Sequence, residues 1–323
     1  MAKLRRRLQR IGSSILVCLP KEWVDNNGLD KQSEVEIEYS ASSIMITPEK
    51  QTRIQKKVEI SYPLPKEENI IATITGAYLL GYDVIAIKSK TSITNEAREQ
   101  IRNTMRRFVG MEITEEDSGK ITIQFLLDAA TLNPEKLLKR ISLLVFGMFN
   151  DVLGVSSDKS SLQGLSNRDN EVNRQYFLLV RLLRSSMIDK HLADTFNLES
   201  IDSLDYRLAA NILENAGDTV VELGELVYNT VIPQIDLEKI HKIFDNFEDA
   251  EQRSILSFIN NDRSLAIDSI RLHKKYHNDL ARFRVQLEKR SRVPLTLLEV
   301  LTMIDRITQS WSDIVDLVKP LYK

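Results

Sequence analysis

The chain has 323 residues, of which 42% are hydrophobic and 28% are charged, and its formal net charge is −2. These values are typical of a globular protein of two or three domains, and they exclude a global electrostatic attraction to nucleic acid. A single cysteine excludes an intrachain disulfide framework and a cysteine-based zinc site. No apolar run approaches the roughly 20 residues that span a bilayer, and the basic N-terminus lacks the apolar segment of a secretory signal. We therefore expect a cytoplasmic protein without membrane insertion.

Residues 1–50 are expected to form a small β unit. Strand-like runs, a glycine turn and a short helix that starts after Pro20 and ends at Gly28 follow one another in this stretch. The strand-like runs occupy residues 15–19, 35–39 and 43–47. Cys18 lies in the first apolar run, where a small buried hydrophobic residue is expected rather than a reactive thiol. A piece of about fifty residues buries little apolar surface alone, and intertwined dimerisation overcomes that limit.

The N-terminal unit also carries a cluster of basic residues, which are Arg5, Arg6, Arg7 and Arg10, with Lys21 after the proline. The order of strand, glycine turn, strand ending in Leu19-Pro20-Lys21-Glu22, short helix, Gly28-Leu29 and two strands resembles the SpoVT/AbrB swapped-hairpin family. The resemblance covers about residues 4–48. It implies a homodimer that interleaves its hairpins and presents the basic residues to DNA.

Val24 and Asp25 depart from that family pattern. In AbrB the matching positions carry arginines used on DNA, whereas neither residue is basic here. The basic cluster can still contact phosphates, whether or not the protein reads bases. The alternative interpretation is a basic tail that is only solvated.

Residues 51–132 are expected to form a small α/β module. Helical and strand-like stretches follow in the order β-α-β-α-β-β, which predicts a small split sheet with helices on one face. The expected strands cover residues 58–61, 83–88, 111–115 and 120–126, and the expected helices cover residues 70–80 and 96–109. Glu115, Glu116 and Asp117 are expected to be solvated at the hairpin turn. The module has no glycine-rich phosphate loop and no nucleophile–histidine pair, so we expect it to position its neighbours.

From residue 133 onward the pattern is helical. A short helix over residues 200–210 is expected to precede a separate amphipathic helix, in which Glu214 and Asp218 lie on one face. Asp169 and Asn173 have the same spacing on an earlier helix. Such side chains either face water or offer oxygen ligands to a cation. Gly217 would let another helix or a bound ion approach the backbone closely.

The segments Asp169-Asn170-Glu171-Val172-Asn173 and Glu214-Asn215-Ala216-Gly217-Asp218 together resemble the PhoU family of phosphate-uptake regulators. The resemblance covers roughly residues 130–320 and implies two helical bundles, with a regulatory rather than a catalytic function. It also implies that Asp169, Glu214 and Asp218 line a metal-binding face. Asn173 stands where the family usually has Asp, so that one charge is lost while an oxygen ligand is kept.

The last third of the chain repeats the helical theme imperfectly. When the last third is aligned with the first bundle, His273 and His277 match Asp169 and Asn173, and Asp305 matches Glu214. Two histidines four residues apart on a helix are suited to hold one transition metal, which Asp305 could complete. The alternative is a degenerate repeat in which two surface histidines replace carboxylates.

The sequence thus predicts a mostly helical α+β chain. We expect a swapped-hairpin β unit over 1–50, a small α/β module over 51–132, and PhoU-like three-helix bundles over 133–232 and 233–323. The predicted function is phosphate-uptake regulation by a dimeric DNA-binding transcriptional regulator, whose sensor region binds a divalent or trivalent metal ion such as Fe, Zn, Mn or Mg. One alternative is an adaptor that binds a phosphate transporter or signalling protein, with the β unit only dimerising. A di-iron enzyme is the weakest alternative, because no Glu-x-x-His pairs occur at the matching positions.

Overall fold

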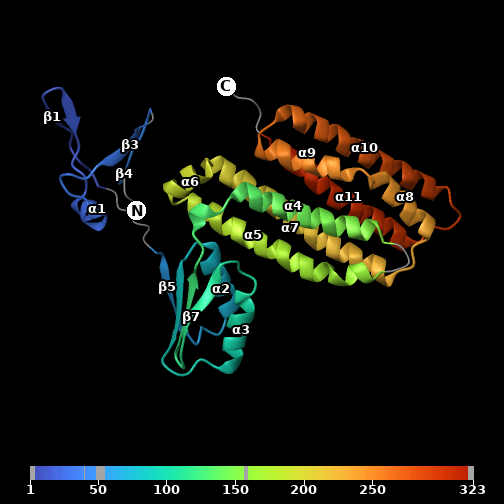
Figure 1. The fold of residues 1–323 in the computed structure, drawn as a ribbon, viewed down its shortest axis with the longest axis horizontal. Helices are drawn as coiled ribbons and strands as arrows, with labels where there is room; N and C mark the ends of the chain where they lie inside the picture. Colours follow the sequence, from blue (N-terminus) through green and yellow to red (C-terminus); the bar gives the residue numbers. More distant parts are fainter. Residues whose placement is uncertain (1–3, 40, 49–54, 156–158, 319–323) are drawn as a thin grey trace. The chain divides into compact units, whose positions relative to one another are not determined.

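The computed structural model describes residues 4–39, 41–48, 55–155 and 159–318. The chain divides into two compact units, residues 1–55 and residues 56–323. As the sequence predicts, helices dominate, a small mixed sheet precedes them, and β hairpins occupy the N-terminal unit (Figure 1). Among the described residues, no helix combines the length and the apolar character that crossing a membrane requires.

The N-terminal unit consists of two antiparallel hairpins and one short helix. Its elements are β1 (Gln9–Ile11), β2 (Ser14–Leu16), α1 (Lys21–Asn26), β3 (Val35–Tyr39) and β4 (Ile44–Pro48). β1 pairs with β2, and β3 pairs with β4. Gly12, at the turn of the first hairpin, has a φ of 61°, a backbone conformation that favours glycine.

This N-terminal unit has almost no buried interior. Apart from Pro48, no described residue between 4 and 48 is fully buried. Ile15 and Ile44 expose 69% and 70% of their surface. The expectation that Cys18 is buried is wrong: this cysteine is exposed, because β2 ends earlier than expected and no described layer covers it.

Residues 57–125 form a four-stranded mixed sheet with two helices, in the element order that the sequence predicts. The elements are β5 (Lys57–Tyr62), α2 (Ile70–Leu79), β6 (Val84–Ser89), α3 (Asn95–Met105), β7 (Met111–Glu116) and β8 (Lys120–Phe125). The strand order is β5-β6-β8-β7, with β5 and β6 parallel and the other neighbours antiparallel. Side-chain oxygens of Asn69 and Thr94 cap the first turns of α2 and α3.

One face of this sheet carries the buried side chains. In β6 and β8 the fully buried residues alternate with less buried ones, as expected for a sheet with one covered face. Ile87 and Ile121 are paired in register on that face, and both are at most 1% exposed. They belong to one hydrophobic cluster with Ile74 of α2 and Ile101 of α3, so both helices cover the same face.

The remainder of the described chain is helical (Figure 1). A short 3-10 turn, η1 (Ala129–Thr131), leads into the first long helix, and another, η2 (Ser160–Gly164), precedes the second. The helices are α4 (Pro134–Leu153), α5 (Leu165–Ser186), α6 (Lys190–Phe196), α7 (Ser200–Asn229), α8 (Gln234–Phe244), α9 (Phe247–Ile259), α10 (Arg263–Glu288) and α11 (Leu295–Val315).

Helix α7 corrects one expectation. The sequence predicts a short helix over residues 200–210 and a separate helix around Glu214, whereas α7 is continuous from Ser200 to Asn229. The intervening residues include Ala209 and Ala210, which are good helix formers and are fully buried in the bundle. Nothing in that stretch interrupts the helical hydrogen bonding.

A single hydrophobic cluster extends through the long helices. It includes Val145 and Phe149 of α4, Leu213 of α7 and Trp311 of α11, all with no exposed surface. The cluster contains residues on both sides of the expected boundary between residues 232 and 233. The division into four domains stays a prediction.

Arg181 of α5 links this helical region to the sheet. Its side chain is 1% exposed, and its Nη1 donates to the carbonyl oxygens of Tyr78 at 2.8 Å and Tyr82 at 2.9 Å. Its guanidinium carbon lies 4.0 Å from the ring centroid of Phe125, a cation–π distance. The sheet and the bundle are therefore joined by a buried polar contact as well as by apolar packing.

Candidate functional site

The predicted acidic face lies where α5 packs on α7. Gly217 of α7 is buried at this contact. A Cβ at Gly217 would lie 3.3 Å from Asp169 Oδ1 and 3.5 Å from Val172 Cγ1. The glycine therefore lets α5, and with it the Asp169 carboxylate, approach the backbone of α7 closely.

Asp169 is the most perturbed group of this face. Burial, and then the nearby Asp218 carboxylate, raise the pKa of Asp169 to about 6. Asn173 opposes that shift, since its Nδ2 donates to Asp169 Oδ2 at 2.9 Å. Asp169 Oδ1 is buried and has no hydrogen-bond partner among the described residues. A proton or a cation at Oδ1 would relieve both the desolvation and the charge repulsion.

Glu214 and Asp218 belong to the same electrostatic group. Burial raises the pKa of Glu214, and the Asp218 and Asp169 carboxylates raise it further, while Arg207 lowers it. Burial and the Glu222 carboxylate raise the pKa of Asp218. The structure thus brings the four residues of the first predicted site near one another on α5 and α7.

These residues do not form a ready metal cage. In the described part of the chain, no three His, Cys, Asp or Glu side chains are grouped as metal ligands. Asn173 directs a donor rather than an oxygen toward Asp169. The orphaned Asp169 Oδ1 fits a cation, but a bound metal would need further oxygen ligands to gather around it. The metal assignment for this face stays a prediction.

The second predicted metal set is divided between two environments. His273 is 7% exposed, and its Nε2 lies 2.8 Å from the Ser254 Oγ. Burial lowers the pKa of His273 to about 4. His277 is exposed, and its Nδ1 lies 3.0 Å from Asp305 Oδ1. The structure therefore joins His277 to Asp305 and places His273 in the core.

Helix rotation explains this division of the two histidines. The buried stripe of α10 continues from His273 to Tyr276 and then to Leu280. Residues four apart on a helix are offset by about 40° because a turn has 3.6 residues, so His277 falls at the edge of the stripe. The i, i+4 spacing placed the two residues on one side of the helix but did not distinguish core from solvent.

The predicted DNA-binding residues are all exposed. Arg5, Arg6 and Arg7 precede β1, whereas Arg10 lies within it and Lys21 begins α1. The Arg10 Nε donates to the Gly12 carbonyl oxygen at 3.2 Å, which holds the side chain near the hairpin turn. Within the described residues, none of the five forms an ion pair with an acidic side chain, so their positive charge is available to a partner.

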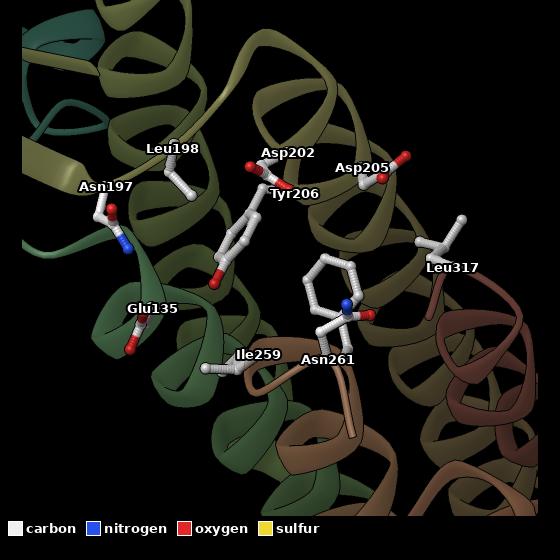
Figure 2. A pocket seen from close by; sticks show the side chains of 10 residues that line it. Glu135, Asn197, Leu198, Asp202, Asp205, Tyr206, Ile259, Asn261 and Leu317 are labelled. Atoms are coloured by element: carbon white, nitrogen blue, oxygen red, sulfur yellow. The ribbon is translucent and has the colours of Figure 1, made fainter. Parts of the chain in front are cut away.

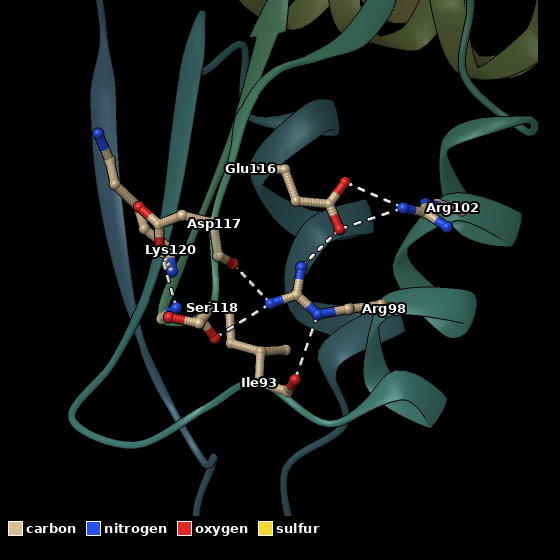
Figure 3. Close-up of polar contacts among 8 residues, drawn as sticks. Ile93, Arg98, Arg102, Glu116, Asp117, Ser118 and Lys120 are labelled. Atoms are coloured by element: carbon tan, nitrogen blue, oxygen red, sulfur yellow. Dashed lines mark hydrogen bonds and ion pairs between the residues drawn. The ribbon is translucent and has the colours of Figure 1, made fainter.

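Arg98 of α3 connects this helix to the β7–β8 hairpin. Arg98 of α3 contacts the Glu116 carboxylate at 2.5 Å, and it donates to the carbonyl oxygens of Asp117 at 2.6 Å and Ser118 at 3.0 Å (Figure 3). Hydrogen bonds from Arg98 and Arg102 lower the pKa of Glu116. Glu116 is exposed, as the sequence predicts, and its contacts with Arg98 and Arg102 also fix the hairpin to α3.

Sequence reasoning missed the buried polar residues of the interior. Arg181 stands within an apolar run of α5, and a cation in such a run was a signal of a buried partner. Glu251 of α9 is 2% exposed, and it pairs with the hydroxyl of Ser142, which accepts from Trp311 Nε1 at 2.8 Å. Burial raises the pKa of Glu251. These groups lie inside the core and do not belong to the acidic face of Asp169, Glu214 and Asp218.

Comparison with known proteins bears on the N-terminal unit. The family described as "Antidote-toxin recognition MazE, bacterial antitoxin" matches residues 8–54. Neither the curated proteins nor the solved structures contain a match. The PhoU-like expectation for residues 130–320 is not confirmed by a family match. The N-terminal unit of this chain is therefore an antitoxin-type domain similar to MazE, in agreement with the swapped-hairpin class predicted for it.

Proposed function

We propose that this chain is a dimeric DNA-binding regulator, with the helical region as its sensor and phosphate uptake as the process it controls. The observation that carries the proposal is the MazE match over residues 8–54, on a unit whose basic residues are exposed. The phosphate part rests on the PhoU resemblance of the two acidic segments. The proposal assigns no catalytic step to the chain.

The exposed apolar residues of the N-terminal unit support the dimer. Ile11, Ile15 and Ile44 expose between 67% and 70% of their surface. Burying an isoleucine contributes about 1.5–3 kcal/mol, so a second copy that covers these residues would supply the missing core. Interleaved hairpins would also place the basic clusters of both chains on one dimer.

The basic cluster supports nucleic acid as the partner. Arg5, Arg6, Arg7 and Arg10 lie within six consecutive positions, and no acidic residue separates them. A dimer would double this local charge, although the net charge of each chain is −2. Arginine binds phosphate oxygens with two parallel hydrogen bonds, which suits it to the DNA backbone.

The acidic face supports a sensor that takes a cation. Asp169, Glu214 and Asp218 all have raised pKa values, so a bound cation would replace the protons that these carboxylates attract. Phosphate could reach such a face only through a bound cation, because carboxylates repel it. Binding there would change the packing of α5 against α7.

The second candidate function is an adaptor that binds a transporter or signalling protein, with the β unit serving only to dimerise. Val24 and Asp25 favour it, because these positions of α1 offer no positive charge for base readout. An adaptor would dimerise through the same apolar residues but would bind no DNA.

The affinity for duplex DNA of mixed sequence, measured at several salt concentrations, separates the two functions. The full chain is compared with R5Q/R6Q/R7Q/R10Q, and with K242Q/R263Q/K274Q/K289Q, which removes the same charge from exposed positions of the helical region. Each lost phosphate contact lowers the slope of log K against log salt by about 0.9. We expect a smaller slope only in the first variant. A wild-type chain that binds no duplex at low salt would overturn DNA binding in favour of the adaptor.

A further inference from the structure

One side of helix α7 is left open to solvent. Helices α4, α5 and α11 pack on α7, and the positions on its remaining side recur at alternating steps of three and four residues. These positions, which we call the α7 stripe, are Ile201, Leu204, Leu208, Asn211, Asn215, Asp218, Glu222 and Glu225. Apart from the half-buried Asn211, all of them are exposed. Heptad spacing of this kind lets one helix present a continuous seam to another helix.

The chemistry of the α7 stripe changes along the helix. Its apolar part comes first and consists of Ile201, Leu204 and Leu208, which expose 49%, 57% and 46% of their surface. Two asparagines follow, and the acidic part then consists of Asp218, Glu222 and Glu225. One end of the stripe therefore favours apolar contact, and the other favours positive charge.

The negative charge of the acidic part is not compensated within the described chain. Neither Glu222 nor Glu225 forms an ion pair with a described residue. Burial, and then the Glu222 carboxylate, raise the pKa of Asp218, as expected where carboxylates lie close together without a cation between them. A positively charged partner would relieve this repulsion.

The apolar part is separate from the cavity beside the start of α7. Asp202 and Tyr206 belong to the same turns of the helix as Ile201 and Leu204, but they line that cavity together with residues of α4, of α9 and of the segment after α11 (Figure 2). No residue of the α7 stripe lines it. The apolar part thus faces a different side of α7 and remains open for a partner.

A second copy of the chain does not match the α7 stripe well. Two stripes aligned in parallel would place one acidic part against the other, and like charges repel. Two antiparallel stripes centred on Leu204 would bury only the three apolar side chains of each chain. A stable interface buries about 800 Å² on each partner, much more than three half-exposed side chains provide.

We propose that the α7 stripe binds an amphipathic helix of a partner protein, which carries apolar residues along one half of its seam and lysine or arginine along the other half. The apolar half would pack on the apolar part of the stripe, as in other helix-in-groove complexes. The basic half would pair with Glu222 and Glu225. This inference goes beyond the proposed function, since it requires neither DNA nor a cation at Asp169.

The test is fluorescence anisotropy of labelled helical peptides with the full chain at low salt. Each peptide has about three heptads, with leucine at the seam positions of one half and lysine at the seam positions of the other half. Peptides with the lysine half first and with the lysine half last are both used, because a partner helix can lie in either direction. A peptide with glutamate in place of lysine should bind at least about tenfold more weakly, because its charges meet the acidic part.

The apolar contribution is tested by L204Q/L208Q. This variant should weaken peptide binding by about tenfold or more, because each leucine loses apolar surface that the peptide covers. I267Q/I270Q is the matched control on α10, where the two isoleucines expose 42% and 43% of their surface. The control should bind the peptide as the wild type does. Thermal unfolding of each variant without peptide shows whether the fold is kept.

The charge contribution is tested by E222Q/E225Q, which leaves the predicted metal ligands intact. This variant should weaken binding by about twofold to tenfold at low salt, and the difference from the wild type should disappear at high salt. E288Q/E299Q removes the same charge from exposed positions of α10 and α11 and should have no effect.

Three results would overturn this inference. One is that neither lysine-containing peptide binds the wild type, and another is that L204Q/L208Q and E222Q/E225Q bind as the wild type does. The third is self-association that persists in I15K, which removes the proposed N-terminal contact, but is lost in I15K/L204Q/L208Q, since the stripe would then bind a second copy. Loss of DNA binding by the arginine variants leaves all these measurements unchanged, so the two proposals fail separately.

Discussion

The Nη2 of Arg181 lies 3.3 Å from Oδ1 of Asp83, and both residues are more than nine-tenths buried. The other carboxylate oxygen of Asp83 accepts from the backbone nitrogen of Lys56 at 2.9 Å. One buried carboxylate therefore joins α5 of the helical region to the first residue of the second unit. A shift of α5 would move Arg181, and with it the Asp83 carboxylate that accepts from the backbone nitrogen of Lys56.

Replacing Arg181 by Met should destabilise the second unit strongly. The substitution leaves the buried Asp83 charge without its cation, and breaking such a pair costs about 3–5 kcal/mol. Two carbonyl oxygens also lose their donor. The free energy of unfolding, measured in urea, gives the cost. Arg184, exposed on the same helix, is the control: its replacement by Met should change stability by less than about 0.5 kcal/mol. Equal effects at the two positions would show that the buried pair is unimportant.

Asp169 should make stability fall as the pH rises from about 4 to about 6. Its folded pKa, about 6, is above the ordinary value of 3.8, so the folded state binds the proton more tightly than the unfolded state. The associated stability is present below pH 4 and is lost as the pH passes 6. Asp169→Asn should therefore be more stable than the wild type at pH 7 by about 1 kcal/mol, a value discounted for solvent screening of this half-buried group.

The comparison for Asp169 is made by urea unfolding at pH 4 and pH 7. Wild type and Asp169→Asn should differ little at the lower pH, because both side chains are then neutral. Asp194→Asn, at an exposed position, corrects for the loss of one negative charge. If Asp169→Asn is less stable than the wild type at both pH values, the carboxylate has a favourable partner that this interpretation lacks.

His273 should make stability fall as the pH is lowered, the opposite of the effect of Asp169. Its folded pKa, about 4, is below its ordinary value of 6.5, so the unfolded state binds the proton more tightly. Stability is complete above pH 6.5 and is lost as the pH falls toward 4, by on the order of 3 kcal/mol. His273→Gln removes this titration, and its stability should depend less on pH between 6.5 and 4.

Nuclear magnetic resonance of the imidazole protons of the wild type measures the His273 pKa directly. A His273 signal that titrates near its ordinary value would contradict the buried position and the contact with Ser254.

Ile15→Lys should dissociate the dimer that we propose. Ile15 exposes 69% of its surface in one chain, and a second copy that covers it would have to desolvate a lysine. Sedimentation at several protein concentrations gives the oligomeric state. Ile188, 70% exposed in the helical region, is the matched position, and Ile188→Lys should leave the oligomeric state unchanged. A wild type that is monomeric at every concentration rules out the dimer.

Local patterns in the sequence predicted much of the fold. The order of strand-like and helical stretches located the strands that contain Ile87 and Ile121, and it located the helix that begins at Ile70. The PhoU resemblance, rather than a local pattern, implies that the carboxylates of Asp169 and Asp218 share a face, and the structure brings them close enough to raise the pKa of Asp169. These features depend on neighbours within a few residues or on two adjacent helices.

Long-range packing was not accessible in the same way. The contact between Arg181 and Asp83 joins residues from α5 and the sheet, and no local pattern encodes it. The cavity around Tyr206 is assembled from four segments. Cys18 was expected to be buried because its run is apolar, yet burial of that run requires a layer that the described part of one N-terminal unit does not provide.

The packing of α5 on the sheet restricts the order in which the chain can fold. The hydrophobic cluster of the sheet includes Leu178 and Leu182 of α5, with Leu192 and Phe196 of α6. The sheet strands end at Phe125, so a nascent chain that has reached only this residue lacks part of the apolar cover of its sheet. Contacts this distant in sequence form late, after the cost of closing a long loop. The sheet and its two helices can complete their interior only after α5 and α6 have been synthesised, so the apolar surface that these later helices cover is exposed to aggregation until then.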